Sequence, residues 1–316
     1  GLDGKHIALW GSHGQYFHQP TESWRWQRAK VWTTVEDLYT TSYTMPFLVP
    51  MLENAGAVVV QPRERDTQTF EQVVDDSQAT LKGQWAIGEG TGWANPITPL
   101  LEGDNPFTKG RYTVEVKCEE NNPSEIIYTP SLPAGEYAVY VSYKSLPQST
   151  SAARYIVNHL GGQSEFIVNQ KMGGGTWIYL GTFEFGADGK GYVALDNRTP
   201  KGYKFEKGSI VTADAVRFGG GMGNIARQRK NKDGEEYEAS VSGMPRSAEA
   251  ARYWLQWAGT DPAIYSQNEE EDDYKDDFMS RGDWVAWLSG GSAMNPAQKG
   301  KGIPVDLSLG FHSDAG

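Results

Sequence analysis

Short apolar runs near both ends of the chain are candidate buried strands. His6–Trp10 and Ala57–Val60 are two such runs, and a third, Val305–Phe311, lies close to the last residue. Between the first two runs, over 33–54, apolar residues recur at spacings of three and four, which predicts a helix. Two prolines inside this stretch must kink or divide it. Strand, loop, helix and strand in this order predict a βαβ unit with a parallel sheet.

After about residue 76 the pattern changes. Alternating or β-rich runs follow one another, with turn residues every eight to twelve positions, which is typical of an antiparallel sandwich. These runs are Tyr137–Tyr143, Ala153–Val157, Ser164–Val168, Thr176–Leu180, Thr182–Phe185, Gly191–Leu195 and Ile210–Phe218.

A helical pattern returns at Ser247–Ala258, after the glycines of 219–221. We therefore expect an α/β domain, with a mostly parallel sheet and helices, that is interrupted by an all-β antiparallel sandwich. Its first half is expected at 1–76, the sandwich at 77–221 and its second half at 222–316. Such insertions are tolerated at surface loops.

Composition excludes several classes of protein. The 316 residues are 38% hydrophobic, enough for more than one core, and the net charge of −11 leaves no basic surface for nucleic acid. Cys118 is the single cysteine, so a disulfide framework and a thiolate zinc site are both excluded. No apolar run approaches the roughly 20 residues of a membrane-spanning helix. The chain starts at Gly1, so we expect an exported protein whose leader has been removed.

Two histidines follow candidate strands. His13 comes after the first strand, between glycines, and His312 follows the last one. Because parallel strands end at one edge of a sheet, both imidazoles are expected at that edge, where Glu36 begins the predicted helix. Two histidines and a carboxylate are ligands that zinc accepts while it keeps a position open for water. Taken singly, each is also explained as a loop histidine or a solvated helix-start glutamate.

Other conspicuous residues have simpler explanations. The acidic run Glu269–Asp277 is interpreted as a solvated loop, because it lacks the glycine spacing of a calcium-binding loop. The tryptophans at 24, 26 and 32, and Trp177 in the predicted sandwich, could stack on sugar rings, but packing in a core is the favoured interpretation.

Several segments of the α/β part resemble the zinc-dependent N-acetylmuramoyl-L-alanine amidases. They are Gly11–Gly14, Glu36, the helix-to-strand junction Leu52–Val60, Arg63–Asp66 and Leu309–Gly316. The loop after the first strand is longer here than in that family, and His-Ser-Asp-Ala-Gly replaces its His-x-Asn-Ala motif.

The resemblance implies a mechanism. Zinc held by His13, Glu36 and His312 would activate water against the amide that joins N-acetylmuramic acid to L-alanine in peptidoglycan. The family's general base is a glutamate on a late strand, and no glutamate follows His312, so the base is expected beyond Gly316 and the chain as given is expected to be inactive. Asp314 is expected to orient a ligand imidazole rather than to act as the base.

The predicted sandwich has a resemblance of its own. Leu132–Tyr140, Gly174–Phe185 and Val211–Phe218 resemble the golvesin C-terminal-like domain, a β-sandwich of bacterial surface proteins that is often taken for a carbohydrate-binding module. The combination of both parts resembles Bacteroidetes proteins labelled xanthan lyase. The alternatives are therefore a non-catalytic surface protein that binds carbohydrate on a degenerate amidase scaffold, or a polysaccharide lyase. All three imply a bacterial glycan as partner and a place in the periplasm or at the cell surface.

Overall fold

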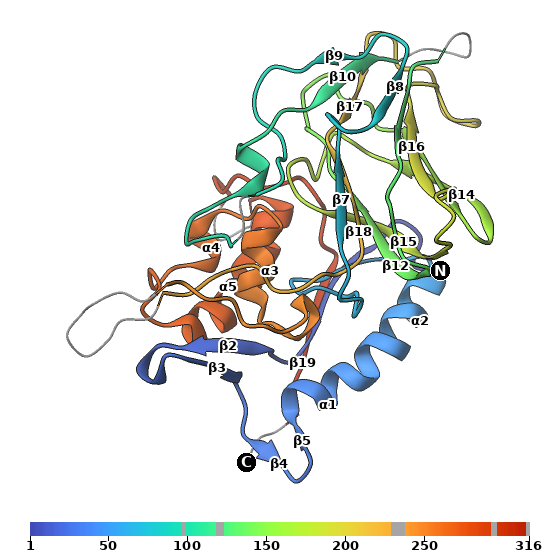
Figure 1. Cartoon of the computed structure of the whole chain (residues 1–316). Helices are drawn as coiled ribbons and strands as arrows, with labels where there is room; N and C mark the ends of the chain where they lie inside the picture. Colours follow the sequence, from blue (N-terminus) through green and yellow to red (C-terminus); the bar gives the residue numbers. More distant parts are fainter. Residues whose placement is uncertain (97–98, 118–122, 229–237, 292–295, 314–316) are drawn as a thin grey trace. The chain divides into compact units, whose positions relative to one another are not determined.

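The computed structural model describes residues 1–96, 99–117, 123–228, 238–291 and 296–313 (Figure 1). The chain divides into two compact units. Unit 1 comprises Gly1–Thr67, Ile97–Asp104 and Met222–Gly316, and unit 2 comprises Gln68–Pro96 and Asn105–Gly221. The chain thus leaves unit 1 twice on its way through unit 2, which differs from the single insertion expected at 77–221.

A three-stranded parallel sheet forms the centre of unit 1. Its order is β19 (Leu307–Phe311), β1 (His6–Gly11) and β6 (Val58–Val60). The middle strand, β1, is buried at Ile7, Ala8 and Leu9, which explains why it is continuously apolar. Both pairings are parallel, as the sequence predicts.

The helix predicted over 33–54 is divided where its prolines require it. α1 (Glu36–Tyr43) continues into a π-helical segment, Thr44–Leu48, and then into α2 (Val49–Asn54). Pro46 lies in the π-helical segment and Pro50 is the second residue of α2, so the change of helical type occurs where two backbone N–H groups are missing. Residues 34–35 are not helical, because they pair in the hairpin of β4 (Lys30–Val31) and β5 (Thr34–Val35).

Unit 1 also contains a second hairpin and the helices α3 (Ala251–Trp257), α4 (Pro262–Tyr265) and α5 (Asp273–Ser289). The hairpin joins β2 (Gln15–His18) to β3 (Ser23–Trp26). None of the helices in the described ranges is both long and apolar enough to cross a membrane.

The interpretation of 269–277 as a solvated loop is wrong for its second half. Asp272 caps α5 by accepting a hydrogen bond from the Lys275 N–H, and Asp273, Asp276 and Asp277 are buried within the helix. Asp273 pairs with the buried Arg227 at 2.7 Å. Arginines from other segments of unit 1 therefore compensate the charges of a run that looks solvated in isolation.

Unit 2 is built from antiparallel strand pairs. One sheet has the order β14 (Gly162–Val168), β13 (Ala153–His159), β16 (Tyr192–Asp196), β11 (Glu125–Tyr128) and β8 (Thr80–Lys82). A second has the order β15 (Ile178–Phe185), β12 (Gly135–Val141), β18 (Ala215–Phe218) and β7 (Gln72–Asp75). A smaller third sheet joins β17 (Ile210–Ala213), β10 (Thr113–Val116) and β9 (Ala86–Ile87).

The boundary expected at residue 77 lies instead at Gln68. The reason is β7, which pairs with β18 from Gln72 to Asp75 and so belongs to the sandwich. Side chains from the facing strands form one apolar core, which includes Val139, Tyr155 and Leu195. The antiparallel pairing of these strands around one core confirms the predicted antiparallel β architecture.

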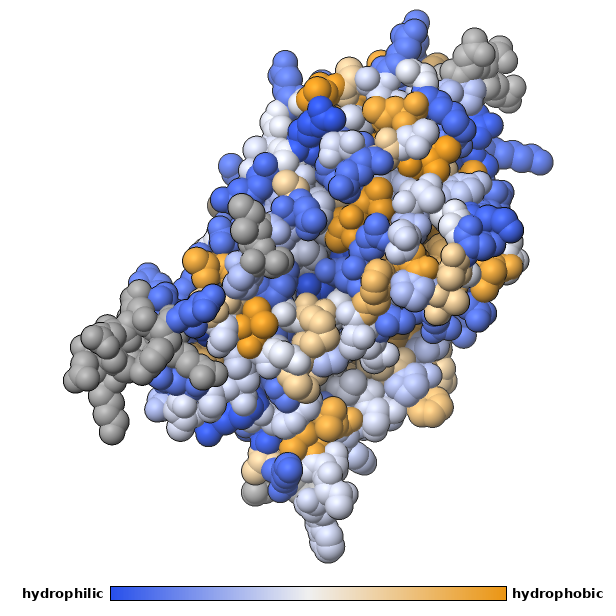
Figure 2. Space-filling view, viewed as in Figure 1, coloured by the Kyte–Doolittle hydropathy of each residue, from blue (hydrophilic) through white to orange (hydrophobic). Residues whose placement is uncertain are grey.

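The tryptophans divide between packing and exposure. Trp177 is buried in unit 2 against Trp93 and Phe107, and Trp24 packs against Phe17 and Tyr253 in unit 1. Packing is therefore the correct interpretation for both. It is wrong for Trp32, which is 95% exposed at the tip of the β4–β5 hairpin. On the face shown in Figure 2, hydrophobic and hydrophilic residues are interspersed.

Candidate metal centre

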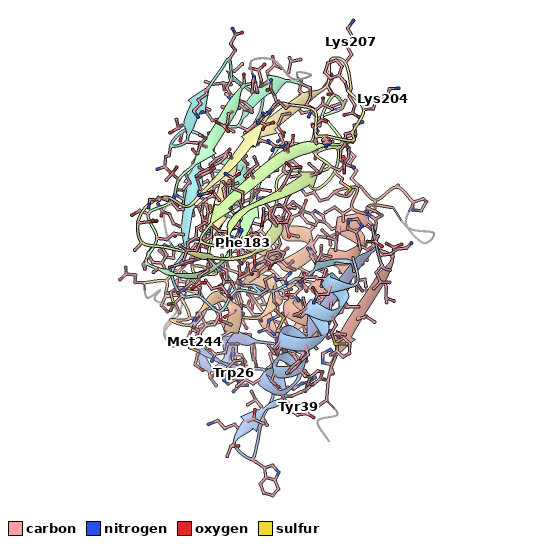
Figure 3. The ribbon with its side chains drawn as sticks, turned by 90° about the vertical axis from the view of Figure 1, so that its right-hand side faces the viewer. Trp26, Tyr39, Phe183, Lys204, Lys207 and Met244 are labelled. Carbon is pink, nitrogen blue, oxygen red and sulfur yellow. The ribbon has the colours of Figure 1, made fainter. Side chains whose placement is uncertain are left out.

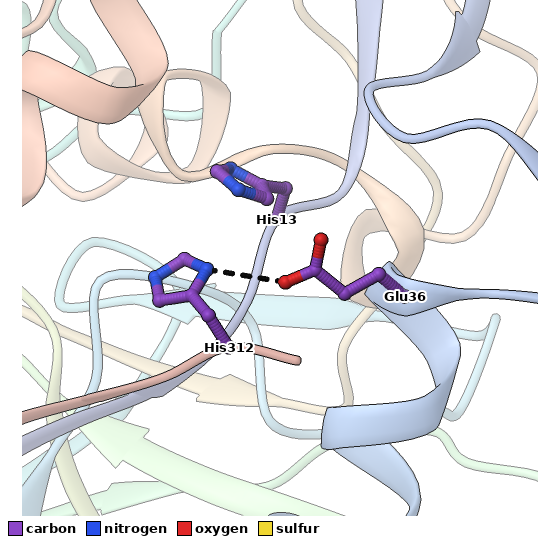
Figure 4. A group of neighbouring side chains, drawn as sticks. All are labelled: His13, Glu36 and His312. Atoms are coloured by element: carbon purple, nitrogen blue, oxygen red, sulfur yellow. Dashed lines mark ion pairs between the residues drawn. The ribbon is translucent and has the colours of Figure 1, made fainter. Parts of the chain in front are cut away.

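Three side chains of unit 1 meet where β1 and β19 end (Figure 4). The register pairs Gly11 with Phe311, so His13 and His312 follow the two strands at the same sheet edge. Glu36 is the first residue of α1. One ligand atom from each of the three lies within 4.8 Å of the others.

This cluster has the donors that zinc binds. His312 Nδ1 is 3.4 Å from Glu36 Oε1, and the two imidazole centroids are 4.9 Å apart. Ligands bonded to one tetrahedral zinc at about 2.0–2.2 Å stand roughly 3.3–3.6 Å from one another, so binding requires the cluster to contract slightly. His13 and Glu36 are buried, whereas His312 is exposed, so the site is open on one side. Occupancy by zinc stays a prediction.

The backbone that carries His13 is held in an unusual path. Ser12 has a φ of 55°, in the left-handed region that is uncommon for residues other than glycine. A Cβ at Gly14 would meet the Glu249 carbonyl oxygen at 2.5 Å, so glycine is needed there for close approach. The neighbours of His13 are thus both restricted: Ser12 by its left-handed backbone conformation, and Gly14 by the lack of space for a side chain.

Arg63, which follows β6, stabilises this backbone conformation around His13. Its guanidinium donates to the carbonyls of Gly11 and His13, and also to those of Ser247 and Glu249 at 3.0 and 3.1 Å. The guanidinium carries five N–H donors in a fixed fork and can therefore serve several carbonyls at once. Arg63 therefore joins the His13 loop to the segment that precedes α3.

A carboxylate from α5 faces the inner nitrogen of His13. Asp277 Oδ2 lies 3.6 Å from His13 Nδ1, and the same carboxylate accepts hydrogen bonds from the Ala251 N–H and the Gln27 amide, both at 2.6 Å. Burial by itself raises the pKa of Asp277, but Arg281 and His13 outweigh it and hold the pKa at about 2. Asp277 is therefore an anion at neutral pH.

Arg281 approaches the same nitrogen. Its Nη2 is 3.1 Å from His13 Nδ1, and its Nη1 donates to the Ser12 carbonyl at 2.9 Å. Nδ1 thus faces both an acceptor and a donor. The tautomer that directs an Nδ1–H at Asp277 is the one that leaves the Nε2 lone pair for a metal.

Arg28 touches two of the three candidate ligands. Its Nη2 is 3.3 Å from His13 Nε2, and its Nε forms an ion pair with Glu36 Oε2 at 3.1 Å. A guanidinium in this place competes with a metal ion for the same lone pairs. Binding of a metal therefore requires Arg28 to withdraw from His13 and Glu36.

Two further titratable groups adjoin the cluster. Burial raises the pKa of Asp37, which accepts a hydrogen bond from the Arg28 N–H. Burial, together with His13 and Arg281, lowers the pKa of His312, although Glu36 acts in the opposite direction. A lowered pKa favours the neutral imidazole, which is the form that binds metals.

The supporting residues are not those that the sequence indicates. Asp314, which the sequence suggests as the carboxylate behind a ligand imidazole, lies outside the described residues. The structure places Asp277 against His13 instead. In the sequence, the only local indication of this role of Asp277 is Arg281, four residues later on the same helix. This spacing also fits an ordinary surface ion pair.

Comparison with known proteins identifies part of unit 2. Residues 105–220 match the Golvesin C-terminal domain family, which confirms the identity predicted for the sandwich. The match does not include His13, Glu36 or His312. A xanthan lyase from Bacillus sp. strain GL1 is 37% identical over 97 residues, which are 29% of this chain and 10% of the lyase. The chain thus spans about a tenth of that relative.

Solved structures resemble the chain over about half its length. The Paenibacillus xanthan lyase matches with 23% identity and a TM-score of 0.37, covering 49% of this chain and 13% of the lyase chain. A family 35 carbohydrate-binding module from Clostridium thermocellum matches with 16% identity and a TM-score of 0.29, covering 47% of this chain and 98% of the module.

Proposed function

We propose that unit 2 binds a bacterial polysaccharide. The observation that carries this proposal is the 37% identity with a protein named xanthan lyase, which ties the segment to a protein that acts on a polysaccharide. Because the shared segment is 10% of that lyase, the likeness does not extend to the lyase reaction. We therefore propose binding for this unit and no lyase activity.

The loop between β16 and β17 offers suitable side chains. Tyr203 is 51% exposed there, and Lys201, Lys204 and Lys207 are exposed around it. Figure 3 shows Lys204 and Lys207 extending away from the strands. An exposed aromatic ring can stack on a sugar ring, and ammonium groups pair with the carboxylates of an acidic polysaccharide. The loop therefore suits an anionic glycan although the whole chain is acidic.

Affinity electrophoresis of the full chain in gels that contain xanthan tests this proposal. We expect retardation that Tyr203→Ala weakens at least several-fold and that salt reduces, because the ammonium contacts are exposed. Phe70→Ala, at another exposed aromatic of unit 2, is the matched control and should be retarded like the wild type. The proposal would be excluded if the wild-type protein were not retarded in gels that contain xanthan and also did not bind to suspended peptidoglycan sacculi.

A second candidate function belongs to unit 1. We propose that it is a zinc-dependent hydrolase of the N-acetylmuramoyl-L-alanine amide or a related cell-wall amide, carried by the meeting of His13, Glu36 and His312. Zinc, when bound, supplies a Lewis acid and an activated water. Asp277 would hold the His13 ring, and Arg28, once displaced, would be free to bind an anionic group of the substrate.

Zinc analysis of the full chain tests this second candidate. We expect about one zinc per chain after dialysis against the metal, and its loss in His13→Ala and His312→Ala. His18→Ala, at a histidine of unit 1 that bonds Thr21 instead, should bind zinc like the wild type. If the zinc content did not depend on His13 and His312, the amidase reaction would lose its basis. If the protein released stem peptide from peptidoglycan sacculi and chelators abolished this release, the proposal would be supported.

A further inference from the structure

Two buried carboxylates, Asp76 and Asp214, interact electrostatically in unit 2. The antiparallel register pairs Asp75 of β7 with Ala215 of β18. Asp76 follows β7 in a turn and Asp214 directly precedes β18, so both adjoin this pair, and the charge of Asp76 raises the pKa of Asp214. Asp76 is 1% exposed and Asp214 2% exposed.

Little positive charge compensates these two groups. Neither oxygen of Asp76 accepts a hydrogen bond of normal geometry among the described residues, although the Ser77 N–H acts to lower its pKa. The nearest cation recorded is Arg111, whose Nε lies 3.8 Å from Oδ1 and whose side chain is 44% exposed. A buried carboxylate without a close partner is costly, since burial removes its hydration and nothing replaces it.

Asp214 is held by neutral donors only. Its Oδ1 accepts the Trp93 N–H at 2.8 Å and its Oδ2 accepts the Ser142 hydroxyl at 2.9 Å. Burial raises the pKa of both Asp76 and Asp214 to about 7, and Asp75 adds to this effect. These contacts orient the Asp214 carboxylate, but each of its oxygens keeps a lone pair for another ligand.

A backbone carbonyl oxygen lies near Asp214. A Cβ at Gly92 would collide with the Arg111 carbonyl oxygen and would lie 2.7 Å from Asp214 Oδ1, so glycine lets the backbone approach this carboxylate. Carboxylates and carbonyls without histidine or thiolate are the ligands of a hard cation, and buried irregular sets of them suit calcium better than zinc. We propose that Asp76 and Asp214 bind a calcium ion that stabilises the sandwich.

Calcium titration of the full chain, stripped with EGTA, tests this proposal. We expect saturable binding of about one ion per chain and a rise of about 5 °C in the midpoint of thermal unfolding at a hundredfold excess over Kd. Asp76→Asn should abolish both responses. Without calcium this variant should melt no lower than the wild type, because it removes an uncompensated buried charge.

Two controls separate this site from other effects. Asp196→Asn alters a buried aspartate of unit 2 that Arg154 and Arg198 already compensate, so it should lower the melting midpoint yet keep the calcium response. His13→Ala should also keep it, which excludes the metal centre of unit 1. Calcium binding that survives in Asp76→Asn, or a wild-type protein whose melting is the same in EGTA and in calcium, would overturn the proposal.

Discussion

His13 and Asp277 form a histidine–carboxylate pair across 264 positions of sequence, with 3.6 Å between Nδ1 and Oδ2. Asp277 is buried on α5, and three neighbours keep it in place: the Ala251 N–H, the Gln27 amide and Arg281. A carboxylate behind a ligand histidine selects the tautomer and fixes the plane of the ring. This pair therefore links helix α5 to the candidate metal centre.

Replacing Asp277 by Asn should weaken zinc binding about 10–100-fold, because the amide no longer holds an Nδ1–H in place as a carboxylate does. Competition with a fluorescent chelator measures the affinity. Asp276→Asn is the matched control, since Asp276 precedes it on the same helix and accepts from Asn268 instead of His13. Equal zinc affinities for the two variants would show that Asp277 supports the fold alone.

Replacing Arg28 by Met should tighten zinc binding by about tenfold. The guanidinium occupies lone pairs of His13 and Glu36, and its removal leaves them free for the ion. The same chelator competition detects the change. Arg25→Met, on the neighbouring strand β3, removes a guanidinium that contacts Tyr16 and should leave the affinity unchanged. Weaker zinc binding by Arg28→Met would mean that Arg28 helps to organise the centre.

Glu249 should make unit 1 less stable as pH rises. Burial raises the pKa of Glu249 to about 7, although Ser242 and Arg246 oppose the shift. The folded state then holds a proton that the unfolded state loses near pH 4.5, so the stabilisation is full below about pH 4.5 and is lost as pH rises to about 7. In urea unfolding, Glu249→Gln should gain about 1–3 kcal/mol over the wild type between pH 5 and pH 8. A constant difference would contradict the shifted pKa.

Trp32 should be dispensable for folding. It is 95% exposed and has a φ of 61°, a conformation that glycine adopts without strain. Trp32→Gly should therefore raise the free energy of unfolding by up to about 1 kcal/mol. Urea unfolding measures this, with Trp24→Gly as the contrasting variant, since Trp24 packs against Phe17 and Tyr253 and its loss should destabilise. A large loss of stability in Trp32→Gly would contradict its exposed position.

We expect that Trp32, which is exposed at the tip of a hairpin, is accessible to a ligand. Tyr39, which Figure 3 shows in unit 1, is a second exposed aromatic residue and lies on α1, the helix that Glu36 begins. Loss of binding to peptidoglycan sacculi in Trp32→Gly, with stability kept, would give Trp32 a role in binding substrate.

Local pattern was enough for several features. The apolar runs of β1 and β19 predicted two parallel strands, and parallel strands necessarily end at one edge, so the meeting of His13 and His312 followed from the sequence. The expected burial is correct for β1 but wrong for β19, which lies at the edge of the sheet with Leu307 48% exposed. The alternating runs of unit 2 predicted antiparallel strands because side chains of a strand alternate between two faces. These signals are carried by residues that are neighbours along the chain.

Only the tertiary structure decided the rest, because the partners come from distant segments. Asp273 is paired with Arg227 and Asp277 lies against His13, so an acidic run that looks solvated is half buried. The unit boundary lies at Gln68 because β7 pairs with β18, more than 130 residues later in the chain. Burial and charge compensation depend on what packs against a residue in space, and a one-dimensional pattern carries no record of those partners.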